Sequence, residues 1–265
     1  MHRLLLFFRT QELLFLCLFV CLMQGCAGRS TIHPESTASK ALWERYLTND
    51  SDIRPYRINM SLRIGKSGDT RRVTALLWGN DMQRQRLDVM AGVGSIVAKI
   101  ASSPNDFLLV APIEGKAYSH SGSQKPRLHL SLPLPLTLSD LTCLLTGQYT
   151  KVFGKEYGEL LDGSKNNVRY TLLDALPGTL ELDDEGRPSV WDERTKRDKN
   201  GWTMRLQYGK DGFPSKLDLS NTKGERFLLV IKEKEAPQSF SEEALSLSVP
   251  QGFPILPITQ KKSTL

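Results

Sequence analysis

Apolar and polar residues alternate strictly in two long stretches of this chain. In residues 56–64 every second side chain is apolar, and the side chains between them are polar or basic. The same period of two returns in residues 202–208. Successive side chains of a β-strand point to opposite faces of a sheet, so this period predicts strands with one buried face. The alternation therefore favours a fold built on antiparallel strands that shield one side from water.

Turn residues separate these stretches from further short apolar runs. Lys66-Ser67-Gly68-Asp69 and Asp211-Gly212 are typical of hairpin turns. We expect other strands at 71–78, 85–90, 95–100, 107–111, 116–119, 168–173, 179–182, 216–219, 226–231 and 245–249. Helices are expected over 40–48 and over 140–145, the second capped by Thr137 or Ser139 and ended by Gly147. The pattern predicts one domain, 41–258, with about ten or eleven strands, two helices and a proline-broken end that packs along an edge.

The N-terminal residues are organised like an export signal. Arg3 and Arg9 precede an apolar run, Leu13 to Met23, which ends just before Cys26. That run is too short to span a bilayer, which takes about 20 apolar residues, and the order is typical of a secretory signal. Gly25-Cys26 resembles the lipobox of bacterial lipoproteins, whose cysteine carries the lipid. We expect a signal peptide at 1–25, lipid on Cys26, a tether over 26–40 and a flexible tail at 259–265; the alternative is a cleaved signal with an incidental cysteine.

The cysteine count and the net charge limit which cross-links, metal sites and binding partners this chain can have. Cys143 is the only cysteine after Cys26, which excludes an intramolecular disulfide and a cysteine metal cluster in the exported chain. The net charge of +6 suits contact with anionic lipid headgroups. No aromatic-basic motif typical of nucleic-acid binding is present. We expect membrane lipid as a partner, no nucleic acid, no cofactor and a monomer.

The sequence lacks the motifs of common catalytic and metal sites. His120 and His129 are the histidines beyond the leader and the tether, and no Gly-x-Ser-x-Gly elbow, His-x-x-x-His or Cys-x-x-Cys spacing occurs. Residues 183–200 form the most charged stretch, without a calcium-loop pattern. This stretch is interpreted as a partner-binding loop or, alternatively, as a solvated hairpin. We expect neither an enzyme nor a metal site.

Large apolar side chains recur on the predicted buried face. A twisted sheet curled around one or two helices gathers such residues on its concave side, where they can form a pocket. Aromatic and thioether groups suit acyl chains, which need contact area rather than directed hydrogen bonds. The candidates for an acyl-binding cavity are Tyr56, Met60, Leu62, Trp78, Leu87, Val89, Trp202 and Met204. The alternative is an ordinary core made of the same residues.

One predicted turn, Gly92-Val93-Gly94, has an apolar residue where turn chemistry favours Asn or Asp. This tip is interpreted as a small wedge that enters a bilayer or a partner. The alternative is a plain hairpin turn.

Several motifs resemble LolB, the family of outer-membrane lipoprotein receptors. The stretch 86–95 resembles the approach to the family's protruding loop, with Val93 in place of its exposed leucine and Gly92 in place of its proline. Trp78 sits where the family has its strand tryptophan, and Leu132-Pro133-Leu134 resembles its Leu-Pro segment. Gly201-Trp202 resembles the start of the family's Trp-x-x-x-Tyr stretch. Together these motifs cover about residues 42–232.

The resemblance implies a mainly β (α+β) fold, an open antiparallel β half-barrel closed by a few helices, as in LolA and LolB. It also implies a cavity for lipoprotein acyl chains, a LolA-type periplasmic carrier as partner, and delivery into the outer membrane from the periplasmic side. Ala27 after the anchor cysteine fits outer-membrane sorting. Val93 shortens the wedge, and the charged stretch exceeds the family's usual length.

Two alternatives to a receptor remain at this point. A scaffold lipoprotein would use the same fold to hold a protein complex, with its interior filled by its own side chains and an apolar patch elsewhere. A receptor would instead have an open cavity and an exposed Val93. An envelope hydrolase, the weakest alternative, would need His120 or His129 beside a serine and an acid.

Overall fold

The structure is a computed structural model that describes residues 32–33, 36–52, 54–66, 68–92, 94–129, 132–162, 168–174, 176–194 and 201–258. The chain divides into two compact units, Met1–Ile32 and His33–Leu265. The expected signal peptide, Cys26 and the tail at 259–265 lie outside the described residues. The fold below is that of the second unit.

Strands dominate the described chain. They are β1 (Ile32–His33), β2 (Tyr56–Lys66), β3 (Asp69–Gly79), β4 (Gln85–Ala91), β5 (Ser95–Ser102), β6 (Asp106–Ala111), β7 (Lys116–Ser121), β8 (Arg127–His129), β9 (Pro133–Thr137), β10 (Tyr157–Asp162), β11 (Val168–Leu172), β12 (Gly178–Leu182), β13 (Pro188–Asp192), β14 (Trp202–Tyr208), β15 (Pro214–Asn221), β16 (Glu225–Glu235) and β17 (Ile255–Pro257). The helices are α2 (Thr37–Thr48), α3 (Leu138–Thr146), α4 (Thr150–Phe153), α5 (Glu242–Leu245) and the 3-10 turn η1 (Pro112–Glu114). Within this part of the chain, no helix has the length and apolarity needed to cross a membrane.

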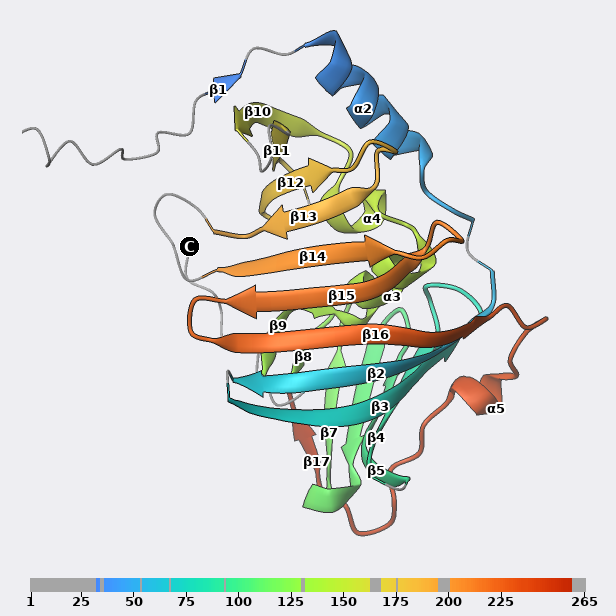
Figure 1. Cartoon of the computed structure of the whole chain (residues 1–265). Coiled ribbons are helices and arrows are strands. Elements are labelled where there is room, and N and C mark those ends of the chain that lie inside the picture. The colour runs from blue at the N-terminus through green and yellow to red at the C-terminus, as the bar shows by residue number, and fades with distance from the viewer. Residues whose placement is uncertain are drawn as a thin grey trace, which may run out of the picture. The chain divides into compact units, whose positions relative to one another are not determined.

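A single large sheet organises the unit. From β10 its order is β10-β11-β12-β13-β14-β15-β16-β2-β3-β4-β5-β6-β7-β17. Neighbouring strands in this order are antiparallel, except that β17 runs parallel to β7. The sheet twists strongly between its two ends and does not close on itself (Figure 1). The mainly β class and the open antiparallel sheet expected from the sequence are confirmed.

The alternation in β2 has a direct structural cause. β2 lies between β16 and β3, with Leu62 opposite Leu229 on one side and Val73 on the other. Residues directly opposite each other in a ladder share one face of the sheet. The apolar positions of β2 therefore continue into both neighbours and form one buried face, which we call the inner face. The other side is the outer face.

Helix ends follow the capping chemistry of the sequence. Thr137 caps α3 through a reciprocal pair of hydrogen bonds with Asp140, and Gly147 ends the helix with a left-handed φ of 81°. Of the two caps expected for this helix, Thr137 is the one used. The first helix, α2, begins earlier than expected, because Ser36 and Ser39 form a capping box ahead of residue 40.

One expected strand is absent, and some of the observed strands, among them β8, β9, β10 and β13, were not expected. Residues 245–249, expected as a strand, are the end of α5 and an irregular segment, because Ser241 caps a short helix through the Ala244 amide. β13 lies inside the charged stretch, and β8 and β9 lie in the proline-containing crossing. With these additions the described residues hold more strands than the ten or eleven expected. The proline-broken end does pack along an edge, where β17 pairs with β7.

Candidate functional site

Seven of the eight cavity candidates gather on the inner face. They come from three strands and belong to one apolar cluster: Tyr56, Met60, Leu62, Leu87, Val89, Trp202 and Met204. Their exposed fractions run from 0% for Met60 and Met204 to 7% for Trp202. At this exposure the side chains touch other protein atoms on nearly every side. The structure therefore brings these seven residues together as a packed interior.

Helix α3 fills the space in front of this face. Leu141, Leu144 and Leu145 are at most 2% exposed and belong to the same cluster as the seven candidates. In the described chain the helix packs directly against the inner face of the sheet. The interior is apolar and continuous, and the protein's own side chains fill it.

A few polar contacts fasten α3 to the rest of the domain. The hydroxyl of Thr142 donates to the side-chain oxygen of Gln85, at 3.2 Å, and both residues are buried. At the end of the helix the Lys234 ammonium donates to the Leu145 carbonyl, at 3.4 Å, and the Ser51 hydroxyl donates to the Thr146 carbonyl. Between these points α3 is held by apolar contact, which is non-directional and tolerates exchange for another apolar group.

Cys143 lies on α3 within the same cluster. Its sulfur is 3.8 Å from the Met82 sulfur, and the residue is 4% exposed. Burial raises the pKa of the Cys143 thiol to about 12, with a smaller contribution in the same direction from Asp140. A buried thiol that stays protonated is unreactive, so Cys143 acts as an apolar packing residue.

A second helix covers the other half of the sheet. Trp43 and Tyr46 of α2 are buried, and the Trp43 ring lies 4.9 Å from the ring of Tyr170 in β11. The Tyr170 hydroxyl donates to the Ser39 carbonyl, and the Tyr46 hydroxyl donates to the Gly154 carbonyl. The aromatic side chains of α2 thus fill the interior over β10 and β11. The sequence carried no signal that pairs Tyr170 with α2.

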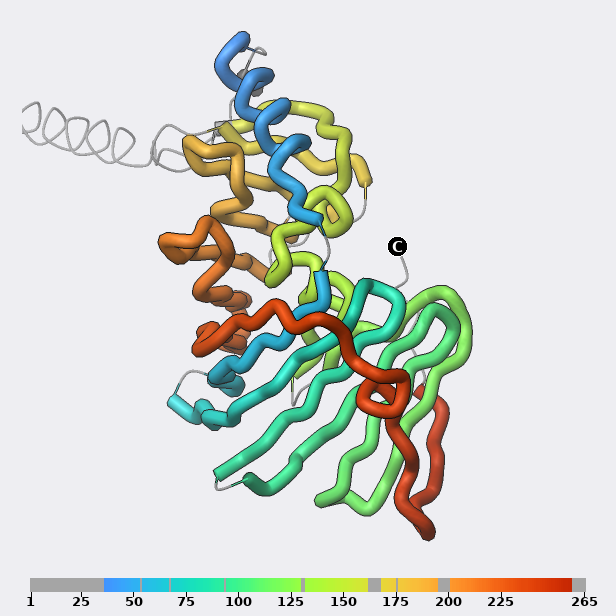
Figure 2. The backbone as a smooth tube through the Cα atoms, turned by 90° about the vertical axis from the view of Figure 1, so that its right-hand side faces the viewer, coloured from blue at the N-terminus to red at the C-terminus, as the bar shows by residue number. Residues whose placement is uncertain are grey.

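Trp78 does not join the other cavity candidates. Its neighbour Leu77 faces the interior, so Trp78 points to the outer face. There its indole nitrogen donates to the Ala244 carbonyl, at 3.2 Å, and the Arg86 guanidinium lies 5.0 Å from its ring centre. We call residues 236–254 the C-terminal strap, because this segment crosses the outer face in front of β3 to β5 (Figure 2). Trp78 holds the strap rather than lining the interior.

The arrangement of strands and helices matches known structures. The chain aligns with a LolA superfamily protein from Nitrosomonas europaea at a TM-score of 0.56 and 9% identity, over 80% of this chain and 99% of that one. A DUF1329 family protein from Desulfovibrio piger aligns at a TM-score of 0.53 and 13% identity, over 80% of this chain and 100% of that one. An outer membrane lipoprotein-sorting protein domain from Vibrio parahaemolyticus aligns at a TM-score of 0.50 and 10% identity, over 79% of this chain and 97% of that one. The chain has a LolA-like fold. No family model matches the sequence, and no curated protein matches it either.

The predicted tip of this LolA-like domain is described only at its two glycines. Gly92 and Gly94 have φ values of 57° and 83°, in the left-handed region that favours glycine. A Cβ atom added at either position would meet no atom within 4 Å, so both face open space. Val93 lies outside the described residues. The wedge stays a prediction.

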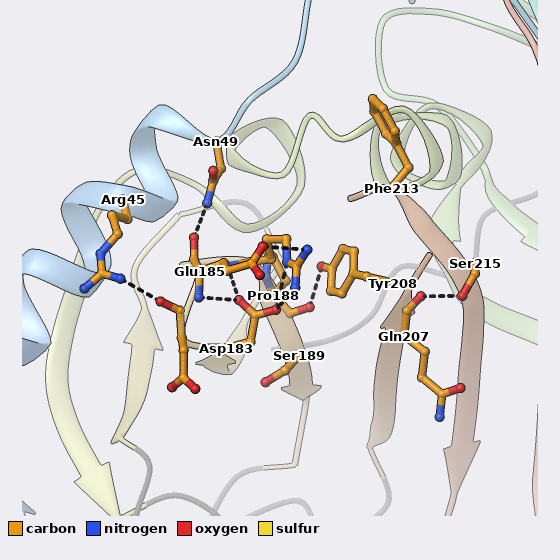
Figure 3. Close-up of polar contacts among 12 residues, drawn as sticks. Arg45, Asn49, Asp183, Glu185, Pro188, Ser189, Gln207, Tyr208, Phe213 and Ser215 are labelled. Atoms are coloured by element: carbon orange, nitrogen blue, oxygen red, sulfur yellow. Dashed lines mark hydrogen bonds and ion pairs between the residues drawn. The ribbon is translucent and has the colours of Figure 1, made fainter. Parts of the chain in front are cut away.

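The first part of the charged stretch has a structural role. Residues 183–187 form the turn between β12 and β13, where Asp183 accepts hydrogen bonds from the Glu185 and Arg187 amides. Figure 3 shows this turn against the C-terminal half of α2. The Arg45 guanidinium donates to the Asp184 carbonyl at 2.6 Å, and the Asn49 amide donates to the Glu185 carbonyl at 2.7 Å. The turn thus fastens α2, and residues 195–200 lie outside the described chain.

Arg187 completes this turn from the other side. Its guanidinium pairs with Asp183 at 2.8 Å and lies 4.3 Å from the ring centre of Tyr208. The Tyr208 hydroxyl in turn donates to the Pro188 carbonyl, at 2.6 Å (Figure 3). These charges are visible in the sequence, but nothing in the sequence indicates their partners on α2 and β14.

The histidines show no catalytic arrangement within the described residues. His120 lies in β7 opposite Phe107, and its buried Nε2 atom has no hydrogen-bond partner there. His129 is exposed in β8. No hydrogen bond links either ring to a serine or an acid in this part of the chain, and no group of three metal-ligating side chains occurs in it.

Proposed function

We propose that this protein is a lipid-anchored envelope lipoprotein of LolB type that receives other lipoproteins from a periplasmic carrier. The observation that carries the proposal is the continuous apolar inner face of a LolA-like sheet, which is covered by the helices α2 and α3 and by the two-stranded sheet β8–β9. Such a face offers an acyl chain contact area along several strands. One of the proteins with a similar fold is a lipoprotein-sorting domain, which also supports the proposal.

Acyl chains would bind where α3 now packs. When an acyl chain displaces α3, its methylene groups replace the helix's leucines, which are similarly apolar. The free-energy cost of this exchange is then limited to the loss of a few polar contacts and to the movement of the helix. Transfer between two apolar cavities then needs only a modest difference in affinity, about 1.4 kcal/mol for each factor of ten. No covalent catalysis is involved in this mechanism.

The remaining parts of the chain fit this role as proposals. Lipid on Cys26 would hold the domain at the outer membrane, facing the periplasm, and the tether expected over 26–40 would end before α2, which begins at Thr37. The tip at Gly92-Val93-Gly94 would enter the bilayer during insertion of the cargo. The two glycines of this tip face open space, which supports a tip that is free to make such a contact.

A scaffold role is the second candidate, and the filled interior favours it. Met60 and Met204 are fully buried against their neighbours, as expected for a core that never opens. A scaffold lipoprotein would keep α3 in place and use an outer surface to hold a protein complex.

A transfer assay separates the two candidates. The chain from residue 26 onward, with Cys26→Ala so that it carries no lipid, is mixed with a LolA-type carrier loaded with radiolabelled lipoprotein. Label that moves to this chain supports the receptor, and Val93→Glu should then block only the later step, insertion into liposomes. If no label moves from a carrier that does load an established acceptor, the receptor proposal is wrong and the scaffold becomes the better account.

A further inference from the structure

The turns along one rim of the sheet present apolar side chains to solvent. In an antiparallel meander alternate turns lie on the same edge, which places the β4–β5 tip, η1 and the strap turn at 250–253 together (Figures 1 and 2, lower edge). Ile113 in η1 is 72% exposed, the highest value among the described large hydrophobic residues that are exposed. Ile255 is 57% exposed and pairs with Ala117, at the start of β7 just after η1.

The backbone of η1 holds Ile113 in this exposed position. Pro112 begins the turn and Gly115 ends it with a left-handed φ of 64°. The Gly115 amide donates to the Pro112 carbonyl, at 3.2 Å, and the Tyr118 hydroxyl donates to the Glu114 carboxylate, at 2.8 Å. Pro112 fixes φ at the start of the turn, and Gly115 accommodates the left-handed conformation that ends it. In this geometry the apolar side chain of Ile113 is exposed at the apex of the turn.

A groove of about 360 Å³ begins beside the same turn. Pro112 lines it together with Val110 and Lys99 on the sheet, and the strap contributes Leu247 and Pro250 on the opposite side. The groove therefore has both apolar and polar walls, and Pro112 brings one end of it next to the turn that carries Ile113.

Two basic side chains line this groove, and they differ in whether a carboxylate already pairs with them. Arg86 pairs with Asp88 at 3.2 Å and donates to the Ser246 carbonyl at 2.7 Å, so its charge and donors are used. Lys99 is half-buried opposite Asp88, and within the described residues no hydrogen bond or ion pair holds its ammonium group. Glu243, on the strap, also lines the groove and pairs with no cation in the same part of the chain.

We propose that this rim is a second contact with a phospholipid bilayer, separate from the Cys26 anchor and the 92–94 tip. Ile113, with Ile255 beside it, enters the boundary between headgroups and acyl chains. Lys99 binds a headgroup phosphate in the groove, and Glu243 meets the ammonium of a phosphatidylethanolamine. An apolar side chain next to a basic group is the combination that favours an interfacial position. The contact requires no acyl-chain binding in the interior, so it can hold even if the proposed receptor role fails.

Vesicle binding tests this contact directly. The chain from residue 26 onward, carrying Cys26→Ala, is sedimented with vesicles of phosphatidylethanolamine and phosphatidylglycerol, with no lipoprotein present. Ile113→Ser should lower the partition coefficient about tenfold, since it removes the aliphatic side chain that the bilayer would bury. Lys99→Gln should lower it about fivefold, the effect of one basic group at a lipid surface.

Matched controls keep the test specific. Leu173 is 62% exposed on a different loop, and Lys151 is exposed on α4, so Leu173→Ser and Lys151→Gln should leave the partition coefficient within about twofold of its starting value. A fluorophore on Ile113→Cys, in a Cys143→Ser background, should shift to shorter wavelength when vesicles are added. Equal effects of Ile113→Ser and Leu173→Ser, or an unshifted fluorophore at residue 113, would overturn the proposal.

Discussion

The hydroxyl of Thr142 donates to the side-chain oxygen of Gln85, and this 3.2 Å bond links the middle of α3 to the first residue of β4. Both side chains are buried, Thr142 at 0% and Gln85 at 1% exposure. The bond is a directional contact within a largely apolar interface, and it shares the one hydroxyl proton of Thr142 with the Leu138 carbonyl, 3.0 Å away. It therefore holds α3 in one position against a face that would otherwise accept many apolar partners.

Removing this bond should loosen α3 without creating a cavity. Thr142→Val keeps the shape of the side chain but leaves the Gln85 oxygen without its donor. We expect a loss of about 1–2 kcal/mol in the free energy of unfolding, measured by urea titration, since a buried acceptor is left unsatisfied. Thr142→Ser retains the hydroxyl and should lose less. Equal stability of Thr142→Val and the parent protein would show that the bond contributes nothing to the position of α3.

Cys143 should report any movement of α3. With Cys26→Ala it is the only thiol in the chain after the leader. Because the thiol is buried and its pKa is raised to about 12, a thiol reagent should react with it far more slowly than with the unfolded chain at pH 8. If acyl chains displace α3, a loaded carrier should accelerate labelling, whereas an empty carrier should not. Labelling that is unchanged during cargo transfer would place the cargo somewhere other than under α3.

Lys234 should make stability rise with pH above neutrality. Burial lowers the pKa of its ammonium group to about 8 in the folded chain, from 10.5, although Asp211 opposes the shift. Between these values the unfolded chain holds the proton and the folded chain does not, so raising the pH favours the folded state. Lys234→Met should remove this gain between about pH 8 and 10.5 in urea titrations. The raised pKa of the Cys143 thiol makes stability fall with pH above about 9. The parent protein and Lys234→Met both carry Cys143, so this effect cancels when their stabilities are compared.

Two turn glycines should differ in their tolerance of alanine. Gly186 and Gly212 have φ values of 78° and 79°, so alanine is strained at both. A Cβ atom at Gly186 would lie 2.8 Å from the Arg45 Cβ atom, whereas one at Gly212 would meet nothing within 4 Å. We expect Gly212→Ala to cost about 1 kcal/mol from strain alone. Gly186→Ala should cost about 2 kcal/mol more, because it pushes α2 away. Equal melting temperatures for the two variants would contradict this role of the turn.

Local chemistry in the sequence predicted much of the fold. The period of two located β2 and β14, and Thr137 and Gly147 located the ends of α3, since strand parity and helix capping depend only on neighbouring residues. β13 was missed because its five residues lie within a charged stretch. Such a strand is stabilised by pairing with β12 and β14, and that pairing carries no local signal.

The candidate site shows the same division. By itself the sequence determined that the chain has a large apolar face with aromatic and thioether residues, because alternation assigns side chains to faces. The sequence placed Trp78 among the cavity residues, but Leu76 and Leu77 are both apolar, so alternation alone does not decide which face of the strand Trp78 occupies. Only the register that pairs Ile58 with Leu77 turned Trp78 outward, beneath the strap. Likewise, only tertiary packing decided that α3 fills the inner face, because that depends on contacts between residues more than fifty positions apart, such as Gln85 and Thr142.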